Sequence, residues 1–238
     1  MTQQEEQRRL LNGVRDWFEE AEQVEHHSAA RHQGLSPAEQ WILRSLNTRG
    51  PILDIGCGAG RVALQLAQRV ATITAADISR PLLRVAQSSA HERAIRLHLV
   101  QTDPLRLSFA NGAFQSVLAI KVYCYIPTRN LRIGYLREIA RLLRPRGELF
   151  MTQYVTPEEW MSAAYDESYQ KIAPGYTVLE EGDTFSVGQH GHSYVHWFTG
   201  QQLREEIQAS GFEIDIFEND REHGGEGYIQ LLRAHSAA

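Results

Sequence analysis

Residues 51–61 read Pro-Ile-Leu-Asp-Ile-Gly-Cys-Gly-Ala-Gly-Arg, and this stretch decides the fold of the chain. The apolar run that opens it predicts a short buried strand, and the closely spaced glycines that follow predict a turn. From Arg61 onward a helix is predicted, because apolar side chains recur at four-residue spacing at Val62, Leu66 and Val70. A buried strand, a glycine turn and a helix are typical of the ligand crevice in an open α/β sheet.

The spacing of the glycines separates two classes of nucleotide-binding proteins. A dinucleotide-binding turn has the pattern G-x-G-x-x-G, whereas here Asp54 is followed by Gly56, Gly58 and Gly60. The pattern D-x-G-x-G-x-G resembles motif I of the class I S-adenosylmethionine (SAM)-dependent methyltransferases. The resemblance implies that Asp54, Gly56, Cys57, Gly58 and Gly60 contact SAM, which leaves as S-adenosylhomocysteine (SAH). The alternative for this segment taken alone is an ordinary tight strand-to-helix turn.

A second acidic residue follows the next predicted strand. Residues 71–76 are predicted to form that strand, and Asp77 ends it. Its distance from the glycines is close to the roughly 20 residues expected of a mononucleotide-binding half. The two oxygens of a carboxylate can accept hydrogen bonds from both hydroxyls of a ribose. We therefore predict that Asp77, with its neighbour Ile78, binds the cofactor; the alternative is that Asp77 only takes part in capping the next helix with Ser79.

Two further segments resemble the cofactor site of the same family. Asp103 and Pro104 follow a predicted strand at 95–100. The resemblance implies that Asp103 accepts a hydrogen bond from the adenine amino group, while Pro104 forms an apolar wall. Ile120 ends a strand predicted at 114–120, where the family places the residues that surround the sulfonium.

The residues after this strand depart from the family pattern, which commonly has Asn, His or small residues here. This chain has Lys121, Cys124 and Tyr125 instead. Lys121 is either a contact for an anionic substrate or a lysine that faces solvent at the end of a strand. The resemblance therefore implies the cofactor and leaves the acceptor of the methyl group open.

Helices are predicted before the glycine turn. Apolar periodicity predicts one helix over residues 3–30 and a second over 38–46, after an N-cap at Ser36. We expect both to lie across the open top of the sheet. The residues near their junction are Arg31, His26 and His27. Arg31 either pairs with the carboxylate at the methionine end of SAM or is a surface arginine.

The resemblance covers about residues 50–234 and implies the fold class. We expect an α/β protein with a doubly wound, Rossmann-like, seven-stranded sheet whose last strand is antiparallel, and with the N-terminal helices and an insertion forming a lid. The expected units are an N-terminal helical cap (1–48), a SAM-binding core (49–155), an insertion that forms the lid and substrate region (156–198), and a C-terminal helix with the closing strands of the core (199–238).

The insertion contains most of the candidate catalytic side chains. Residues 191–198 alternate as a strand does, which places His192 and His196 on one face. The candidate general bases are His190, His192 and Tyr125. Two other interpretations of the histidines are structural residues with satisfied hydrogen bonds and a metal site. We expect no metal, because no acid or cysteine completes a ligand set and no H-E-x-x-H motif is present.

The composition bears on the class of partner. The 238 residues carry a net charge of -5, so no strong electrostatic attraction to nucleic acid is expected. No apolar run approaches the length of a membrane span, the polar N-terminus does not resemble a secretory signal, and the two cysteines imply no disulfide framework. We expect a cytoplasmic monomer or homodimer that contacts neither nucleic acid nor a membrane.

Methyl transfer from a sulfonium is an in-line displacement, in which the protein mainly aligns the reacting atoms and excludes water. A base is needed only where the nucleophile starts protonated. We therefore expect a SAM-dependent methyltransferase that acts on an oxygen or nitrogen atom of a small-molecule acceptor. The alternatives are a methyltransferase acting on a macromolecule, a SAM- or SAH-binding module without methyl transfer, and a nicotinamide-dependent oxidoreductase, which the glycine spacing disfavours.

Overall fold

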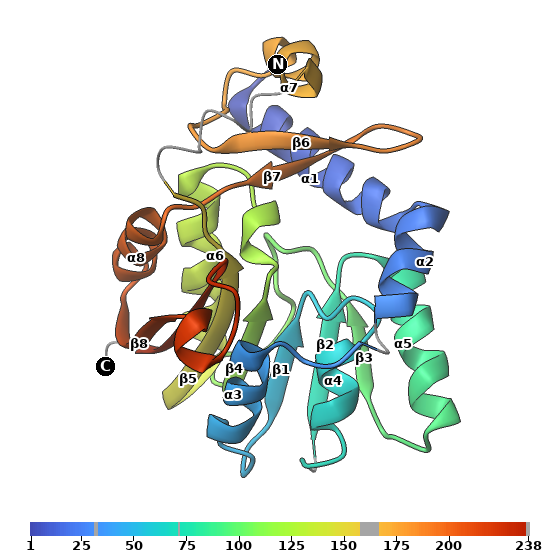
Figure 1. Cartoon of the computed structure of the whole chain (residues 1–238), viewed down its shortest axis with the longest axis vertical. Coiled ribbons are helices and arrows are strands. Elements are labelled where there is room, and N and C mark those ends of the chain that lie inside the picture. Colours follow the sequence, from blue (N-terminus) through green and yellow to red (C-terminus); the bar gives the residue numbers. More distant parts are fainter. Residues whose placement is uncertain (31–32, 71, 158–166, 237–238) are drawn as a thin grey trace.

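A sheet of seven strands forms the centre of the protein, in the order β3-β2-β1-β4-β5-β9-β8 (Figure 1). The computed structural model describes residues 1–30, 33–70, 72–157 and 167–236. The strands are β1 (Ile52–Ile55), β2 (Ile73–Asp77), β3 (His98–Gln101), β4 (Phe114–Ile120), β5 (Leu143–Tyr154), β8 (Phe212–Asn219) and β9 (Ile229–Ser236). β9 runs antiparallel to both of its neighbours, and the other pairs are parallel. The predicted seven-stranded α/β fold with an antiparallel last strand is therefore confirmed.

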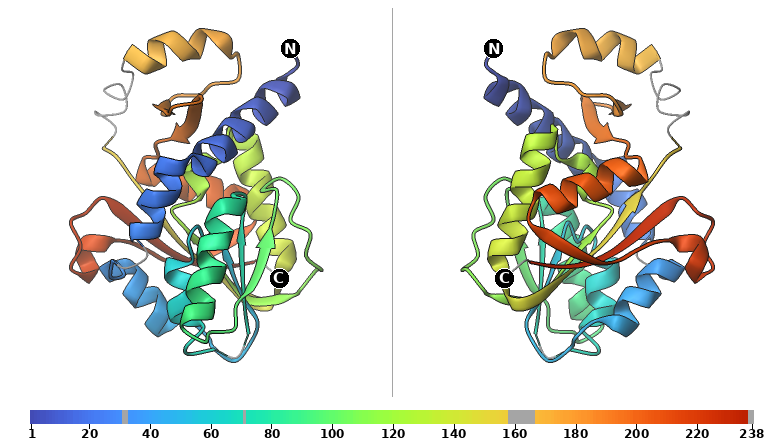
Figure 2. Two further views of the ribbon diagram at one scale, coloured as in Figure 1. Left: turned by 90° about the vertical axis from the view of Figure 1, so that its right-hand side faces the viewer. Right: turned by 90° about the vertical axis from the view of Figure 1, so that its left-hand side faces the viewer.

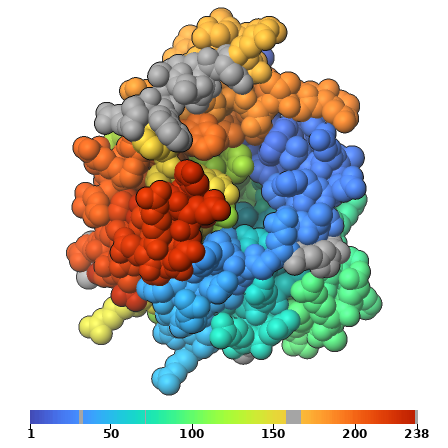
Figure 3. Space-filling model, in the orientation of Figure 1, coloured from blue at the N-terminus to red at the C-terminus, as the bar shows by residue number. Residues whose placement is uncertain are grey.

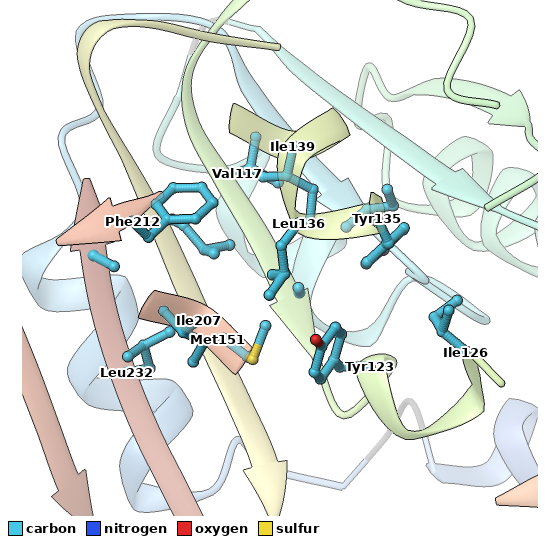
Figure 4. Packing of buried hydrophobic residues seen from close by; sticks show 14 of the residues in the cluster. Val117, Tyr123, Ile126, Tyr135, Leu136, Ile139, Met151, Ile207, Phe212 and Leu232 are labelled. Atoms are coloured by element: carbon cyan, nitrogen blue, oxygen red, sulfur yellow. The ribbon is translucent and has the colours of Figure 1, made fainter. Parts of the chain in front are cut away.

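Helices cover both faces of this sheet. α3 (Pro37–Ser45), α4 (Arg61–Leu66) and α5 (Arg80–Glu92) pack on one face, and α6 (Arg129–Leu142) and α8 (Gly200–Ala209) pack on the other. Figure 4 shows the second layer, where side chains of α6 and α8 meet those of the central strands. Successive residues of a strand point to opposite faces, so β1, with all four of its residues buried, is covered on both sides. Among the described helices, none has both the length and the apolar character needed to cross a membrane.

The segment between β5 and α8 builds a hairpin above the large sheet. β6 (Asp183–Val187) pairs antiparallel with β7 (His192–His196), which confirms the strand predicted within 191–198. α1 (Gln3–Glu19) packs against the hairpin through Leu10 and Val14, and Figure 2 shows both at the same end of the molecule. The smaller elements are η1 (Tyr123–Tyr125), α7 (Glu167–Ile172), η3 (Ala173–Gly175) and η4 (Asp220–His223). The sequence also favours a helix over residues 157–171, but residues 158–166 lie outside the part of the chain that the structure describes.

The single helix predicted over 3–30 is wrong, because the segment forms α1 and a separate helix α2 (Ala21–Ala30). Glu20 between them has extended backbone angles, φ -62° and ψ 141°. Its buried carboxylate accepts hydrogen bonds from the backbone N–H groups of Gln189 and His190, at 3.1 and 3.0 Å. These donors belong to the β6–β7 turn, far along the chain, so local periodicity could not reveal the break.

Candidate active site

A cavity of about 310 Å³ lies at the carboxyl ends of β1, β2 and β4, within the range of about 300–1,000 Å³ typical of small-molecule sites. The glycine turn and the strand ends form its floor, and α1 and α2 cover it. Figure 3 shows a hollow between the blue N-terminal helices and the yellow and red C-terminal part of the chain. The predicted cofactor residues that line the cavity are Asp54, Gly56, Cys57, Gly58, Asp77, Ile78, Pro104 and Ile120.

Backbone hydrogen bonds hold the glycine turn against the end of β2. The N–H groups of Gly56 and Cys57 both donate to the carbonyl of Ala76 at the end of β2, at 2.8 and 3.1 Å. Gly56 and Gly58 have positive φ angles, of 70° and 53°. A Cβ at Gly56 would lie 2.4 Å from the side chain of Val122, whereas a Cβ at Gly58 would meet no atom within 4 Å. Gly56 thus serves the packing of the turn, while Gly58 leaves free space at the cavity wall.

Alanine at these two glycines is therefore expected to have different effects. Gly58→Ala should fold, with a strain of about 1 kcal/mol from its left-handed backbone, and should weaken SAM binding because its methyl group occupies the cavity wall. Gly56→Ala should lose stability by about 1–3 kcal/mol because it overpacks against Val122. Thermal unfolding and SAM calorimetry on both variants measure this contrast. Equal losses of stability in the two variants would contradict it.

Asp77 is buried and fixed at the end of β2. Its Oδ2 accepts from the N–H of Gly58 at 2.7 Å, and its Oδ1 accepts from the N–H of Ser79 at 2.8 Å. Burial raises its pKa, while these hydrogen bonds oppose the rise. The cap of α5 is supplied by the hydroxyl of Ser79, which accepts from Leu82. The carboxylate of Asp77 retains free lone pairs at the cavity, so its role as a ribose ligand stays a prediction.

Asp54 is a buried carboxyl group that faces the cavity from β1. Its Oδ2 has no hydrogen-bond partner among the described residues. Burial raises its pKa to about 7; Arg61 opposes the rise, and Asp77 and Glu39 add to it. Buried polar atoms are normally hydrogen-bonded. An unpaired carboxylate oxygen at a cavity wall therefore fits a ligand that carries a cation or a hydrogen-bond donor.

The positive side chains at the same end of the cavity are already paired. Arg61 donates to both carboxylate oxygens of the buried Glu39, at 2.6 and 2.5 Å. Lys121 lies 3.6 Å from Glu39 and 5.2 Å from the ring centroid of Tyr154. Lys121 is therefore neither a lone cation for an anionic substrate nor a lysine that simply faces solvent.

Asp103 is engaged outside the cavity. Its carboxylate accepts from the guanidinium of Arg8 on α1 and from the N–H of Leu105 at 2.9 Å, and its side chain is 40% exposed. Its neighbours Thr102 and Pro104 line the cavity instead. A hydrogen bond from the adenine amino group to Asp103 stays a prediction. It would have to form beside the ion pair between Asp103 and Arg8, or displace that ion pair.

Two of the candidate bases, His190 and His192, are not among the residues that line the cavity. His190 is exposed in the hairpin turn, and His192 Nε2 lies 2.9 Å from the Tyr176 hydroxyl. The alternation of β7 directs His192 toward an aromatic cluster beneath α1, with Phe185 at 5.1 Å. Tyr125 does line the cavity, and burial raises its pKa. Its hydroxyl is therefore a proton donor rather than a base.

The remaining predicted residues have other places. Gly60 is the N-cap of α4, with φ of 85°, and does not line the cavity. Arg31 lies outside the described residues. Within those residues, no three His, Cys, Asp or Glu side chains are grouped to hold a metal ion.

Sequence reasoning did not assign several side chains of the cavity wall, among them Phe18 on α1, His27 on α2 and Tyr154. The sequence placed His27 only near a helix junction. In the structure, burial lowers the pKa of its imidazole. Apolar periodicity could not assign it, because the break at Glu20 sets the direction of α2.

The chain is similar to known methyltransferases. Residues 52–147 match the methyltransferase domain family. The chain is 26% identical over 166 residues to the demethylmenaquinone methyltransferase of Thermus thermophilus, which covers 68% of this chain and 74% of that protein. It is 34% identical over 131 residues to the methyltransferase GfsG of Streptomyces halstedii, which covers 54% of this chain and 44% of that protein.

A similar solved structure is that of the 1,6-didemethyltoxoflavin-N1-methyltransferase of Burkholderia thailandensis, with bound 1,6-didemethyltoxoflavin and S-adenosylhomocysteine. The TM-score is 0.70 at 17% identity, and the match covers 100% of this chain and 92% of that chain. At this identity the similarity concerns the fold.

Proposed function

We propose that this chain acts as a SAM-dependent methyltransferase on an oxygen or nitrogen atom of a small-molecule acceptor. The observation that carries the proposal is one cavity, which runs from the glycine turn to the helices that cover it. A macromolecular acceptor needs an open approach to the methyl group. A cavity covered by α1 and α2 instead suits a small acceptor.

The residues of the cavity fit the cofactor. SAM carries an ammonium group and a sulfonium, and the unpaired Oδ2 of Asp54 suits such a cation. Gly58 leaves room for a ligand, and Asp77 offers a fixed carboxylate for a ribose diol. When bound, SAM supplies a methyl group already activated for displacement. The task of the chain is then to hold the acceptor in line with that group and to exclude water.

The relatives support a small acceptor. One is named for its action on demethylmenaquinone, and the structural neighbour holds a small heterocyclic ligand. In this chain the covering side chains include Leu11, Val14 and Phe18 of α1, which are apolar. We infer that α1, α2 and the β6–β7 hairpin act as the lid, and that they enclose the acceptor with the cofactor.

Asp77→Asn is expected to weaken SAM binding by about 10- to 150-fold, since hydrogen bonds to a charged group contribute about 1.5–3 kcal/mol. Isothermal titration calorimetry measures the loss. Asp215→Asn, on β8 and outside the cavity, is the matched control and should bind SAM as the wild type does. Unchanged affinity in Asp77→Asn would contradict the assigned cofactor site.

Transfer of tritiated methyl groups from SAM tests the acceptor class. The wild-type protein is incubated with a cell extract divided into metabolites, RNA and protein. Label in the metabolite fraction supports the proposal. Label only in RNA or protein would show that the acceptor is a macromolecule, and SAM binding without any transfer would favour a binding module.

A further inference from the structure

One end of the cavity is walled by aromatic rings that come from different elements. Phe18 of α1 meets Tyr125 of η1 edge to face, with ring centroids 4.9 Å apart, and lies 5.4 Å from the ring of His27 on α2. Tyr154, at the end of β5, also lines the cavity. Rings arranged in this way can contact a planar ligand with their faces and edges, because aromatic pairs favour stacked and edge-to-face contacts.

His27 is suited to accept a proton at this end. Burial lowers its pKa, and the nearby charges of His26 and Arg61 lower it further, so the ring is neutral near pH 7. No hydrogen bond to either of its ring nitrogens is formed among the described residues. A neutral imidazole with a free nitrogen lone pair is a competent general base.

The other titratable groups on the cavity wall have different tasks. Arg61 and Lys121 are paired with Glu39. Tyr125 keeps its proton. Asp54 and Asp77 adjoin the glycine turn, where the proposed cofactor lies. His27 lines the cavity from α2, next to the ring of Phe18.

We propose that His27 is the general base of the methyl transfer, and that the acceptor is a planar aromatic or heteroaromatic compound with an ionisable O–H or N–H. The inference rests on the proposed function. The acceptor lies among Phe18, Tyr125 and Tyr154, and its proton passes to a ring nitrogen of His27. The acceptor atom forms the new bond to the methyl carbon, the carbon–sulfur bond breaks, and its electron pair stays on sulfur. His27 then returns the proton to solvent.

The test compares His27→Asn with Glu25→Gln, whose side chain is exposed on the same helix and does not line the cavity. Two acceptors are used: unsubstituted phenol, which is protonated in the assay buffer, and an acidic nitrophenol, which is already ionised there. For phenol, His27→Asn should lower kcat by about 10²- to 10⁴-fold with little change in KM. For the nitrophenol the loss should be less than about tenfold, because no proton has to be removed. Added imidazole should restore part of the activity toward phenol.

A binding measurement complements the kinetics. Calorimetry should give the same SAM affinity for all three proteins, within about twofold.

Several outcomes would overturn the inference. An equal loss of activity toward both acceptors would assign His27 a positioning role, and an equal loss in Glu25→Gln would trace the effect to α2 as a whole. Methylation of aliphatic but not aromatic acceptors would overturn the acceptor class. A wild-type protein that binds no SAM would instead overturn the proposed function itself, so the two failures are distinguishable.

Discussion

Asp54→Asn is expected to stabilise the unliganded protein at neutral pH by up to about 4 kcal/mol, and to lose most of its affinity for SAM. The first effect follows from the difference between a pKa of 3.8 for an ordinary aspartate and about 7 in the fold, since each pKa unit corresponds to about 1.4 kcal/mol. The second follows because asparagine carries no charge to balance a cationic ligand. When a substitution raises stability and weakens ligand binding, the original residue is typically one that is retained for function.

The sign of the pH dependence follows from the same two pKa values. The unfolded chain releases this proton near pH 3.8, whereas the folded chain keeps it up to about pH 7. Between these values the folded state binds more protons, so the contribution of Asp54 to stability falls as pH rises. The difference in unfolding free energy between variant and wild type should therefore be near zero below pH 3.8, grow through the interval and level off above about pH 7.

Denaturant unfolding of wild type and Asp54→Asn across this pH range measures the difference, with Asp215→Asn as the control. A difference that does not vary with pH would contradict the buried, neutral state of Asp54. SAM calorimetry adds an independent measurement. Wild-type affinity should rise by up to about tenfold per pH unit below pH 7, because binding then requires the release of one proton.

Arg132→Met is expected to destabilise the fold by about 3–5 kcal/mol, because it leaves a buried carboxylate without its partner. Arg132 is fully buried on α6 and donates to both oxygens of the equally buried Glu206 of α8, at 2.7 and 2.9 Å. It also donates to Glu180 at 2.9 Å. Glu206 accepts a further hydrogen bond from the hydroxyl of Tyr123, at 2.8 Å. For a chain of this size the loss corresponds to a fall in Tm of about 6 to 20 °C.

The control is Arg137→Met, which removes an exposed arginine from the same helix and should change stability by less than about 0.5 kcal/mol. The double variant Arg132→Met with Glu206→Leu should lose less than the sum of the two single variants, because no unpaired charge then remains buried. Strictly additive losses would show that the two groups do not act as a pair. The network extends through Tyr194 and Asp183 into the β6–β7 hairpin, so SAM binding should be measured on the same variants.

The sequence alone determined the features that depend on near neighbours along the chain. The strand, glycine turn and helix over residues 52–66 lie where the pattern predicted them. The caps of α3 and α5, at Ser36 and Ser79, were also correct. A cap joins residues three positions apart, and amphipathic periodicity is likewise local, so both are readable from a short window.

Only the tertiary structure decided which side chains meet at the cavity. Glu20 breaks the N-terminal helix because it binds a hairpin turn far along the chain, and that break turns His27 toward the site. The same packing holds His192 in a separate aromatic cluster and engages Asp103 with Arg8. The physical reason is that burial and hydrogen bonding between distant segments set the direction of each side chain, and no local pattern of residue types encodes those partners.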